Sequence, residues 1–329
     1  MSFKILGTGS ALPSRIIDNG ELSEFLDTSD EWITQRVGIS ERRVCTTETT
    51  TDLAYGAAMA ALDMSGVTPQ ELDMIICATV SADNVAPPLA CSVQARLGAG
   101  CPAMDVNAAC SGFIYMLETA AAFFARGRAK RILVVGAERL SRLVDWTDRS
   151  TAVIFGDGAG AMVLGQGGAY LSSKLFAKGG ETVLNIPCGD GMSPYYENEP
   201  RHPYIYMNGQ ETFKFAVKAM ATDLSEVTEA AGLKLEDIAW FVPHQANARI
   251  IDAAAKRLGI PPERCCKNIN MAGNTSAASI PILADELCRS GKLRDGDYIA
   301  LCSFGAGLTS AACVIKWETP PGLQIIPPK

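Results

Sequence analysis

Apolar and polar positions along the chain follow two different periods. Short runs that are apolar at nearly every position, such as residues 74–80, are typical of strands buried on both faces. Longer segments with apolar residues at helical spacing, such as residues 53–66, indicate helices. Because the two kinds of segment alternate, the sequence predicts an α/β fold with a mostly parallel sheet covered on both faces.

The predicted elements form two similar series, interrupted by two irregular segments. In the first series, strands are expected at residues 4–12, 74–80, 103–106, 131–137 and 159–164, with helices at 53–66, 90–97 and 111–126. In the second series, strands are expected at residues 171–177, 238–243, 298–304 and 309–317, with helices at 210–231, 247–258 and 277–289. Residues 186–207 and 320–329 lack periodicity and are predicted to be a long loop and a peripheral tail.

The two series predict two pseudo-repeated halves, residues 1–168 and 169–329. In each half a turn opens an Ala- and Ser-rich helix, at residues 107–112 in the first half and 273–278 in the second. Matching these turns makes Asn274 the counterpart of Cys110. Both helix starts are therefore expected to converge on one pocket.

Composition and charge narrow the class of protein. Hydrophobic residues make up 48 % of the chain and charged residues 20 %, which is typical of a globular protein. The formal net charge of −7 disfavours nucleic acid as a partner. No apolar run is long enough to span a membrane, and the N-terminus lacks the apolar stretch of a signal peptide, so a cytoplasmic location is expected. The 11 cysteines contain no Cys-x-x-Cys pair and are expected to be reduced, mostly in the core.

Motifs for cofactors are missing from the sequence. It contains no Walker motif, no dinucleotide-binding fingerprint and no metal-ligand spacing of histidine or cysteine, so neither a cofactor nor a metal is expected. The glycines of residues 7–10 are not followed by a fingerprint that opens a helix, and those of residues 156–160 lead into a strand. They are predicted to allow tight backbone packing rather than phosphate binding.

Three polar residues stand at the ends of predicted elements. Cys110 lies at a helix start, where backbone N–H groups favour a thiolate and lower its pKa, although a buried apolar cysteine fits the position equally well. His244 follows the apolar strand 238–243, at the edge where ligands bind in open α/β sheets; a structural histidine is the alternative. Asn274 also stands at a helix start, where an asparagine is often only a cap.

Five ordered motifs connect the chain to a known family. They are residues 27–33 (DTSDEWI), 108–113 (AACSGF), 155–161 (FGDGAGA), 243–247 (PHQAN) and 273–279 (GNTSAAS). In these motifs the chain resembles β-ketoacyl-acyl carrier protein synthase III, the initiating condensing enzyme of type II fatty acid synthesis, over residues 4–317. The resemblance implies a thiolase-like five-layered αβαβα fold and a homodimer.

The resemblance also implies a reaction and its residues. The reaction is decarboxylative Claisen condensation of an acyl-CoA primer with malonyl-acyl carrier protein, which gives a 3-oxoacyl-acyl carrier protein. Cys110 would carry the acyl group, and His244 and Asn274 would stabilise the enolate that forms as CO₂ leaves. The backbone N–H groups of Cys110 and Ala306 would form a second oxyanion hole. The CoA thioester is a substrate, so no cofactor is implied.

Contacts with the substrates follow from the same resemblance. The residues implied to bind CoA and pantetheine are Thr28, Trp32, Arg36, Arg149, Gly209, Phe213, Ala246 and Asn247. The residues implied to contact the carrier protein are Lys214, Gln245, Arg249, Lys256 and Arg257. A basic patch on an acidic protein favours an acidic partner, with ordinary solvated helix charge as the alternative.

The chain departs from the family at two positions. Ala306 replaces a glycine found in some members and keeps the backbone donor. Ala86 stands where some members have phenylalanine at the end of the acyl pocket, which predicts tolerance for primers larger than acetyl. The alternative functions are a starter-unit polyketide synthase or an acyltransferase of the same superfamily in secondary metabolism, a non-catalytic partner subunit and a cysteine hydrolase.

Overall fold

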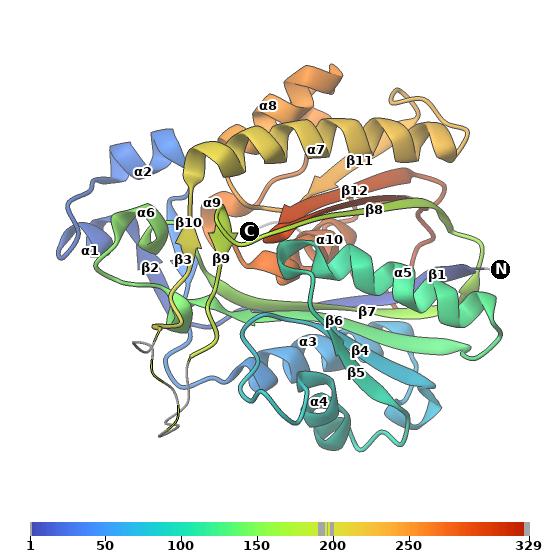
Figure 1. Cartoon of the computed structure of the whole chain (residues 1–329). Coiled ribbons are helices and arrows are strands. Elements are labelled where there is room, and N and C mark those ends of the chain that lie inside the picture. Colours follow the sequence, from blue (N-terminus) through green and yellow to red (C-terminus); the bar gives the residue numbers. More distant parts are fainter. Residues whose placement is uncertain (1, 190–194, 196, 198–200, 326–329) are drawn as a thin grey trace.

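The chain folds into five layers, in the order helices, sheet, helices, sheet, helices (Figure 1). This computed structural model describes residues 2–189, 195, 197 and 201–325. Parts of the predicted loop 186–207 and tail 320–329 therefore lie outside the described residues. Helices α3 and α4 form one outer layer, α5 and α10 the middle layer, and α7 and α8 the other outer layer. The αβαβα arrangement predicted from the sequence is confirmed.

The first sheet has the strand order β1-β7-β6-β4-β5. Strands β1, β4, β5 and β6 run in one direction and β7 runs against them. Its strands are β1 (Ser2–Ala11), β4 (Met74–Ala78), β5 (Ala103–Val106), β6 (Arg131–Arg139) and β7 (Asp157–Gly167). The helices beside it are α3 (Thr50–Ser65), α4 (Leu89–Leu97) and α5 (Gly112–Ala125).

The second sheet repeats four strands of the first. Its order is β8-β13-β12-β11, with β13 antiparallel to the other three, so it matches β1-β7-β6-β4. Its strands are β8 (Tyr170–Gly180), β11 (Ile238–Pro243), β12 (Tyr298–Gly305) and β13 (Gly307–Lys316). Its helices are α7 (Gly209–Ala230), α8 (Ala248–Leu258) and α10 (Ser279–Arg289). The one antiparallel strand in each sheet refines the prediction of a mostly parallel sheet.

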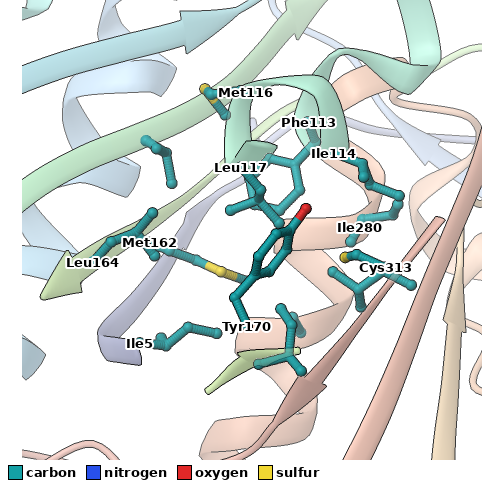
Figure 2. Close-up of a cluster of buried hydrophobic side chains, with 14 of the residues drawn as sticks. Ile5, Phe113, Ile114, Met116, Leu117, Met162, Leu164, Tyr170, Ile280 and Cys313 are labelled. Carbon is teal, nitrogen blue, oxygen red and sulfur yellow. The ribbon is translucent and has the colours of Figure 1, made fainter. Parts of the chain in front are cut away.

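The middle layer holds a core that joins the halves. Figure 2 shows side chains of α5 and α10 packed between strands of both sheets, with Met162 of β7 and Cys313 of β13 on opposite sides. At the sheet edges, Phe3 and Tyr170 stack with ring centroids 4.7 Å apart. Helix α5 is apolar around most of its circumference because it is buried between two sheets.

Two glycine segments pack as the sequence predicts. A Cβ at Gly9 would lie 2.4 Å from the backbone oxygen of Ala57 in α3. A Cβ at Gly160 would lie 2.6 Å from the backbone nitrogen of Ile282 in α10. Only glycine allows β1 and β7 to approach these helices so closely, so tight packing is the confirmed role of both segments.

Several short elements were not predicted. They are α1 (Asn19–Ser23), α2 (Asp30–Arg36), α6 (Arg149–Ala152), α9 (Ile269–Ala272), β2 (Ile16–Asp18), β3 (Glu41–Arg43), β9 (Leu184–Asn185) and β10 (Tyr206–Met207). They are too short to show a hydrophobic period. Among the described residues, no helix has the length and apolar content needed to cross a bilayer.

The turns that open α5 and α10 correspond to each other, but their residues align in a different register from the predicted one. Short 3-10 helices, η2 (Ala109–Ser111) and η5 (Ser276–Ala278), precede α5 and α10. Ala109 and Ser276 both have positive φ, 49° and 48°. Each backbone N–H is accepted by an asparagine two residues earlier, Asn107 and Asn274. Asn274 is therefore the counterpart of Asn107, and the predicted pairing of Asn274 with Cys110 is wrong.

Candidate active site

A pocket of about 110 Å³ lies where the two halves meet. Polar side chains from both halves line it, among them Cys110 from η2, His244 after β11 and Asn274 before η5. The rest of its wall is mostly apolar and includes Phe155 and Phe304. The three residues singled out in the sequence therefore share one cavity.

The loop that carries Cys110 is shaped by its neighbours in both halves. The side-chain oxygen of Asn107 accepts the N–H of Ala109 at 3.2 Å and closes the turn before η2. The end of β12 packs directly on this loop: a Cβ at Gly305 would lie 2.7 Å from the backbone nitrogen of Cys110. The position of the sulfur thus depends on a glycine in the second half.

Burial holds the Cys110 thiol in its neutral form. Removal from bulk water raises the pKa of Cys110 to about 12; interaction with the Ser276 hydroxyl lowers it and the charge of Glu138 raises it further. Cys110 keeps only partial exposure, and the pocket is the space it borders. The expectation that a helix start lowers this pKa is wrong, because burial is the largest influence on the pKa of Cys110 and raises it.

His244 is fully buried except for its access to the pocket. Its backbone N–H donates to Cys302 O at 2.8 Å, which continues the pairing of β11 with β12. Its Nδ1 lies 2.7 Å from Ser279 Oγ, while Nε2 has no partner among the described residues. Burial lowers the pKa of His244 to about 3, so the imidazole is neutral at physiological pH.

Asn274 is buried and uses its carbonyl oxygen within the chain. Its Oδ1 accepts the backbone N–H of Ser276 at 2.8 Å. Its backbone N–H donates to Ile154 O at 2.9 Å, and its backbone oxygen accepts from Gly156 N at 3.0 Å. The turn therefore uses the acceptor of the carboxamide, and Nδ2 is the side-chain donor not used in this turn.

Ala306 also lines the pocket, directly after β12. Its backbone oxygen accepts the hydroxyl of Thr309 at 3.0 Å, and the same hydroxyl lies 3.1 Å from Ala108 O. Thr309 thus ties the loop after β12 to the loop that carries Cys110. Cys110 and Ala306, whose backbone N–H groups were predicted to form an oxyanion hole, therefore line the same cavity.

Four further predicted residues line this pocket. They are Gly209, Phe213, Ala246 and Asn247. The wall also includes residues that the sequence did not single out, above all Leu184, Ile186, Ile205 and Met207 at the two ends of the unperiodic loop. The sequence pointed to these residues only through the length of the loop, because long loops in compact domains are usually functional.

The other four residues predicted to bind CoA gather beside the pocket. The guanidinium carbons of Arg36 and Arg149 lie 5.9 Å and 5.4 Å from the ring centroid of half-buried Trp32. Arg149 is held by Asp27 at 3.1 Å. Arg36 O accepts the side-chain N–H of Asn247 at 3.2 Å, which joins α2 to the pocket wall. Thr28 lies in the same segment, and its buried hydroxyl has no partner among the described residues.

Four of the five predicted carrier-protein residues are exposed, and one is not. The exposed residues lie on α7 and α8, which pack together, and they are Lys214, Arg249, Lys256 and Arg257. Gln245 is 1 % exposed. It donates to Pro243 O and Cys266 O and accepts from the backbone N–H of Asn268. The prediction that Gln245 contacts a partner protein is therefore wrong. The hydrogen bonds of Gln245 instead hold the segment after β11 in place.

Ala86 lies apart from the pocket. It sits in the exposed loop between β4 and α4, beside the fully exposed Val85, and is not part of the pocket wall within one chain. Among the described residues, no group of three or more His, Cys, Asp or Glu side chains is placed to hold a metal ion.

Comparison with known proteins gives concordant matches over nearly the whole chain. Residues 104–179 match the family 3-oxoacyl-(acyl-carrier-protein) synthase III, and residues 228–317 match its C-terminal part. A β-ketoacyl-(acyl-carrier-protein) synthase III of Caldanaerobacter subterraneus subsp. tengcongensis is 49 % identical over 322 residues, covering 95 % of this chain and 97 % of the relative.

Solved structures agree with these sequence matches. The 3-oxoacyl-(acyl-carrier-protein) synthase III of Aquifex aeolicus VF5 superposes with a TM-score of 0.91 at 46 % identity, covering 96 % of this chain and 100 % of that one. The priming β-ketosynthase of the R1128 polyketide pathway has a TM-score of 0.91 at 35 % identity, with 97 % of each chain covered.

The five-layered fold and its shared pocket define a thiolase-like condensing enzyme. Sequence identities near 45 % over almost the full length allow the family to be assigned within this class. The chain belongs to the β-ketoacyl-(acyl-carrier-protein) synthase III family and is an acyltransferase.

Proposed function

We propose that the enzyme transfers an acyl group from acyl-CoA to Cys110 and then condenses it with malonyl-acyl carrier protein, as the first condensation of fatty acid synthesis. The observation that carries the proposal is the gathering of a thiol, an imidazole and a carboxamide around one largely apolar cavity. Such a cavity excludes water, which would otherwise hydrolyse the acyl-enzyme.

In the first half-reaction, the Cys110 sulfur attacks the thioester carbonyl carbon and CoA leaves. The backbone N–H groups of Cys110 and Ala306 stabilise the oxyanion. The close approach of Gly305 to Cys110 supports this assignment, because it brings the loop before Ala306 against the loop of the nucleophile. Backbone donors at fixed positions need little reorganisation as charge develops.

In the second half-reaction, His244 and Asn274 donate hydrogen bonds to the malonyl thioester oxygen. Loss of CO₂ leaves an enolate, whose carbon attacks the acyl carbon on Cys110. The bond from this carbon to the Cys110 sulfur breaks, and the released thiolate takes up a proton. If the Ser279 hydroxyl donates to Nδ1 of His244, the ring proton resides on Nε2, the nitrogen without a partner. Asn274 has its Oδ1 engaged and its Nδ2 left to donate. Two neutral donors therefore face the developing negative charge.

Substrate access is proposed to run past Trp32. Stacking of adenine on this indole, with Arg36 and Arg149 available for phosphate groups, fits the geometry of the three side chains. The pantetheine arm would then pass Gly209, Phe213, Ala246 and Asn247, which belong to the pocket wall. No cofactor is needed in this scheme, since the CoA thioester is consumed as a substrate.

The carrier protein is proposed to dock on α7 and α8. The patch consists of Lys214, Arg249, Lys256 and Arg257 on a protein of net charge −7. Such a patch favours encounter with an acidic partner. Lys214 already pairs with Glu211 at 2.8 Å, which reduces its share of the attraction.

Assembly, location and division of the chain complete the proposal. A cytoplasmic homodimer is proposed; the unpaired edge of β5 and the exposed Val85 support a partner at that end of the first sheet. A division between residues 168 and 169 is supported by the end of β7 at Gly167 and the start of β8 at Tyr170. The role of Ala86 in primer choice remains a prediction, and a partner subunit would have to bring this loop to the acyl group.

The proposal is tested by intact-protein mass spectrometry after incubation with acyl-CoAs of increasing chain length. A mass increase of one acyl group, mapped to Cys110 and missing in Cys110→Ala, is expected. Adding malonyl-acyl carrier protein should then remove the label and release CO₂. An enzyme that is never acylated at Cys110, or that keeps its acyl group, would contradict the proposal.

A further inference from the structure

We propose that Arg42 is a positioning residue for the second half-reaction: it holds residues 153–156 in place, and these residues fix Asn274. The inference rests on the role proposed for Asn274 as a hydrogen-bond donor to the malonyl thioester oxygen. It adds the interactions that keep this donor in position.

Residues 153–156 pair with the backbone of Asn274. The N–H of Asn274 donates to Ile154 O at 2.9 Å, and Asn274 O accepts the N–H of Gly156 at 3.0 Å. The two segments form a parallel bridge between Phe155 and Asn274. Since both backbone groups of Asn274 are engaged here, a shift of residues 153–156 would displace the carboxamide of Asn274 as well.

Arg42, a fully buried residue of β3, contacts both segments of the bridge. Its Nη2 donates to Val153 O at 3.0 Å, one residue before Ile154. A Cβ added at Gly156 would lie 3.3 Å from Arg42 Cβ, and a Cβ added at Gly273 would lie 3.2 Å from it. The Arg42 side chain therefore packs against a glycine of each segment and hydrogen-bonds to one of them.

The other side of the guanidinium is held by Asn19, which is 1 % exposed. Arg42 Nη1 donates to Asn19 Oδ1 at 2.9 Å and to Ile17 O at 3.2 Å. The side-chain N–H groups of Asn19 donate to Asp30 Oδ1 at 2.8 Å and to Ile39 O at 2.7 Å. Because the Asn19 carboxamide is itself fixed by these bonds, the guanidinium has little freedom to turn.

Stability alone does not account for an arginine at this place. Arg42 hydrogen-bonds to neutral oxygens, and its Nε has no partner among the described residues. Burial lowers the pKa of Arg42 to about 10, although the charges of Asp18 and Glu41 oppose the shift, so the guanidinium stays charged at neutral pH. A buried cation with such partners is costly, and replacing buried charged groups by apolar side chains of similar volume is often neutral or stabilising. The planar guanidinium instead offers donors in a fixed fork, which suits the precise placement of two oxygens.

The two half-reactions depend differently on this arrangement. In the proposed mechanism, acyl transfer uses the Cys110 sulfur and two backbone N–H groups, while the role of Asn274 falls in the second half-reaction. A small displacement of a reacting group costs a large factor in rate. Loss of the Arg42 fork should therefore slow the second half-reaction selectively.

The test compares Arg42→Met with the unaltered enzyme in each half-reaction. The first measurement is the rate of Cys110 acylation at saturating acetyl-CoA, by rapid quenching and mass spectrometry. The second is the rate of CO₂ release from malonyl-acyl carrier protein by the acylated enzyme. Arg42→Met should slow CO₂ release by about 10²-fold and leave acylation nearly unchanged. Equal slowing of both half-reactions would overturn the proposal.

Arg289→Met is the matched control. Arg289 also donates from Nη2 to a backbone oxygen, Thr8 O at 3.1 Å, but it joins α10 to β1. Loss of its ion pair with Asp285 should lower the melting temperature without changing the ratio of the two rates. Where Arg42→Met does not fold, Arg42→Lys replaces it, because lysine keeps the charge but has one nitrogen in place of the fork. It should show the same selective loss.

A double variant tests whether Arg42 acts through Asn274. Asn274→Asp removes the proposed donor but keeps an oxygen for the turn. In this background, Arg42→Met should slow CO₂ release no further, because the group that Arg42 positions is already missing. Losses that multiply in the double variant would show that Arg42 acts by another route and would overturn the proposal.

Hydrogen–deuterium exchange keeps the placement of Asn274 separate from the proposed function. Arg42→Met should speed amide exchange about tenfold in peptides that cover residues 153–156 and 270–276, and Arg289→Met should not. If this exchange increased while Asn274→Asp released CO₂ at the unaltered rate, the role of Asn274 would be refuted and its positioning by Arg42 retained. Unchanged exchange and unchanged rates in Arg42→Met would refute the positioning alone.

Discussion

The hydroxyl of Ser279 lies 2.7 Å from Nδ1 of His244, on the side of the ring away from its unpartnered Nε2. The same hydroxyl oxygen accepts the backbone N–H of Gln245 at 3.3 Å. An oxygen that already accepts one hydrogen bond is well placed to donate its own proton to Nδ1. With Ser279 as the donor to Nδ1, the first residue of α10 places the ring hydrogen of His244 on Nε2.

Ser279→Ala should slow the release of CO₂ from malonyl-acyl carrier protein by about tenfold, the worth of one oriented hydrogen bond. The rate of Cys110 acylation should be nearly unchanged, because the role proposed for His244 falls in the second half-reaction. Ser172→Ala, which removes a hydroxyl that donates to Val227 O far from the pocket, is the matched control. Equal slowing of both half-reactions would contradict a role through His244.

Asn274→Asp should reduce CO₂ release by about 10²–10³-fold, the usual effect of removing one oxyanion donor. The aspartate keeps an oxygen for the N–H of Ser276 and so preserves the turn. The melting temperature should therefore change less than in Asn274→Ala, which loses both the turn and the donor. Comparable activity in Asn274→Asp and the unaltered enzyme would exclude Nδ2 as the donor.

The stability of the enzyme should decrease in acid partly through His244. Its pKa is about 3 in the folded protein, below the ordinary value of 6.5. Between these values the unfolded chain binds more protons, so this contribution is full above pH 6.5 and is lost as the pH falls toward 3. Thermal unfolding between about pH 4 and 6 should be less pH-dependent in His244→Gln. His202→Gln, which changes an exposed histidine, should follow the unaltered protein.

Gly305→Ala should impair acylation without touching a reacting group. The added Cβ would lie 2.7 Å from the backbone nitrogen of Cys110, so the loop of the nucleophile or the end of β12 must move. A loss of at least tenfold in the acylation rate is expected, because small displacements of reacting groups cost large factors. Gly168→Ala, where no atom lies within 4 Å of the new Cβ, should acylate normally.

The sequence predicted the long elements within a few residues because their burial is nearly complete. Strands such as β4 and β11 are apolar at almost every position, which only a sheet covered on both faces explains. The short elements α2 and α6 were missed because they are held by caps, such as Ser29 and Asp148, rather than by a hydrophobic period. They nevertheless carry Trp32 and Arg149.

The sequence predicted which residues line the candidate site, but it did not predict their pKa values. Cys110 and Asn274 stand at helix starts that were predicted to converge on one pocket, and His244 stands at a strand end where ligand binding was predicted. The raised pKa of Cys110 depends on packing against the second half, which local reasoning about a helix start does not contain. Gln245 was misassigned for a similar reason, since its partner Asn268 lies 23 residues further along the chain.

The matched turns before α5 and α10 have a consequence for the enzyme as a whole. One turn presents the sulfur, and the other presents the carboxamide and the Ser276 hydroxyl, while His244 comes from the same side as the carboxamide. A polypeptide cut between β7 and β8 would separate Cys110 from His244 and Asn274, the two side chains proposed to stabilise the enolate. Neither fragment alone would turn over, and reassembly of the two would be the condition for any recovery of catalysis.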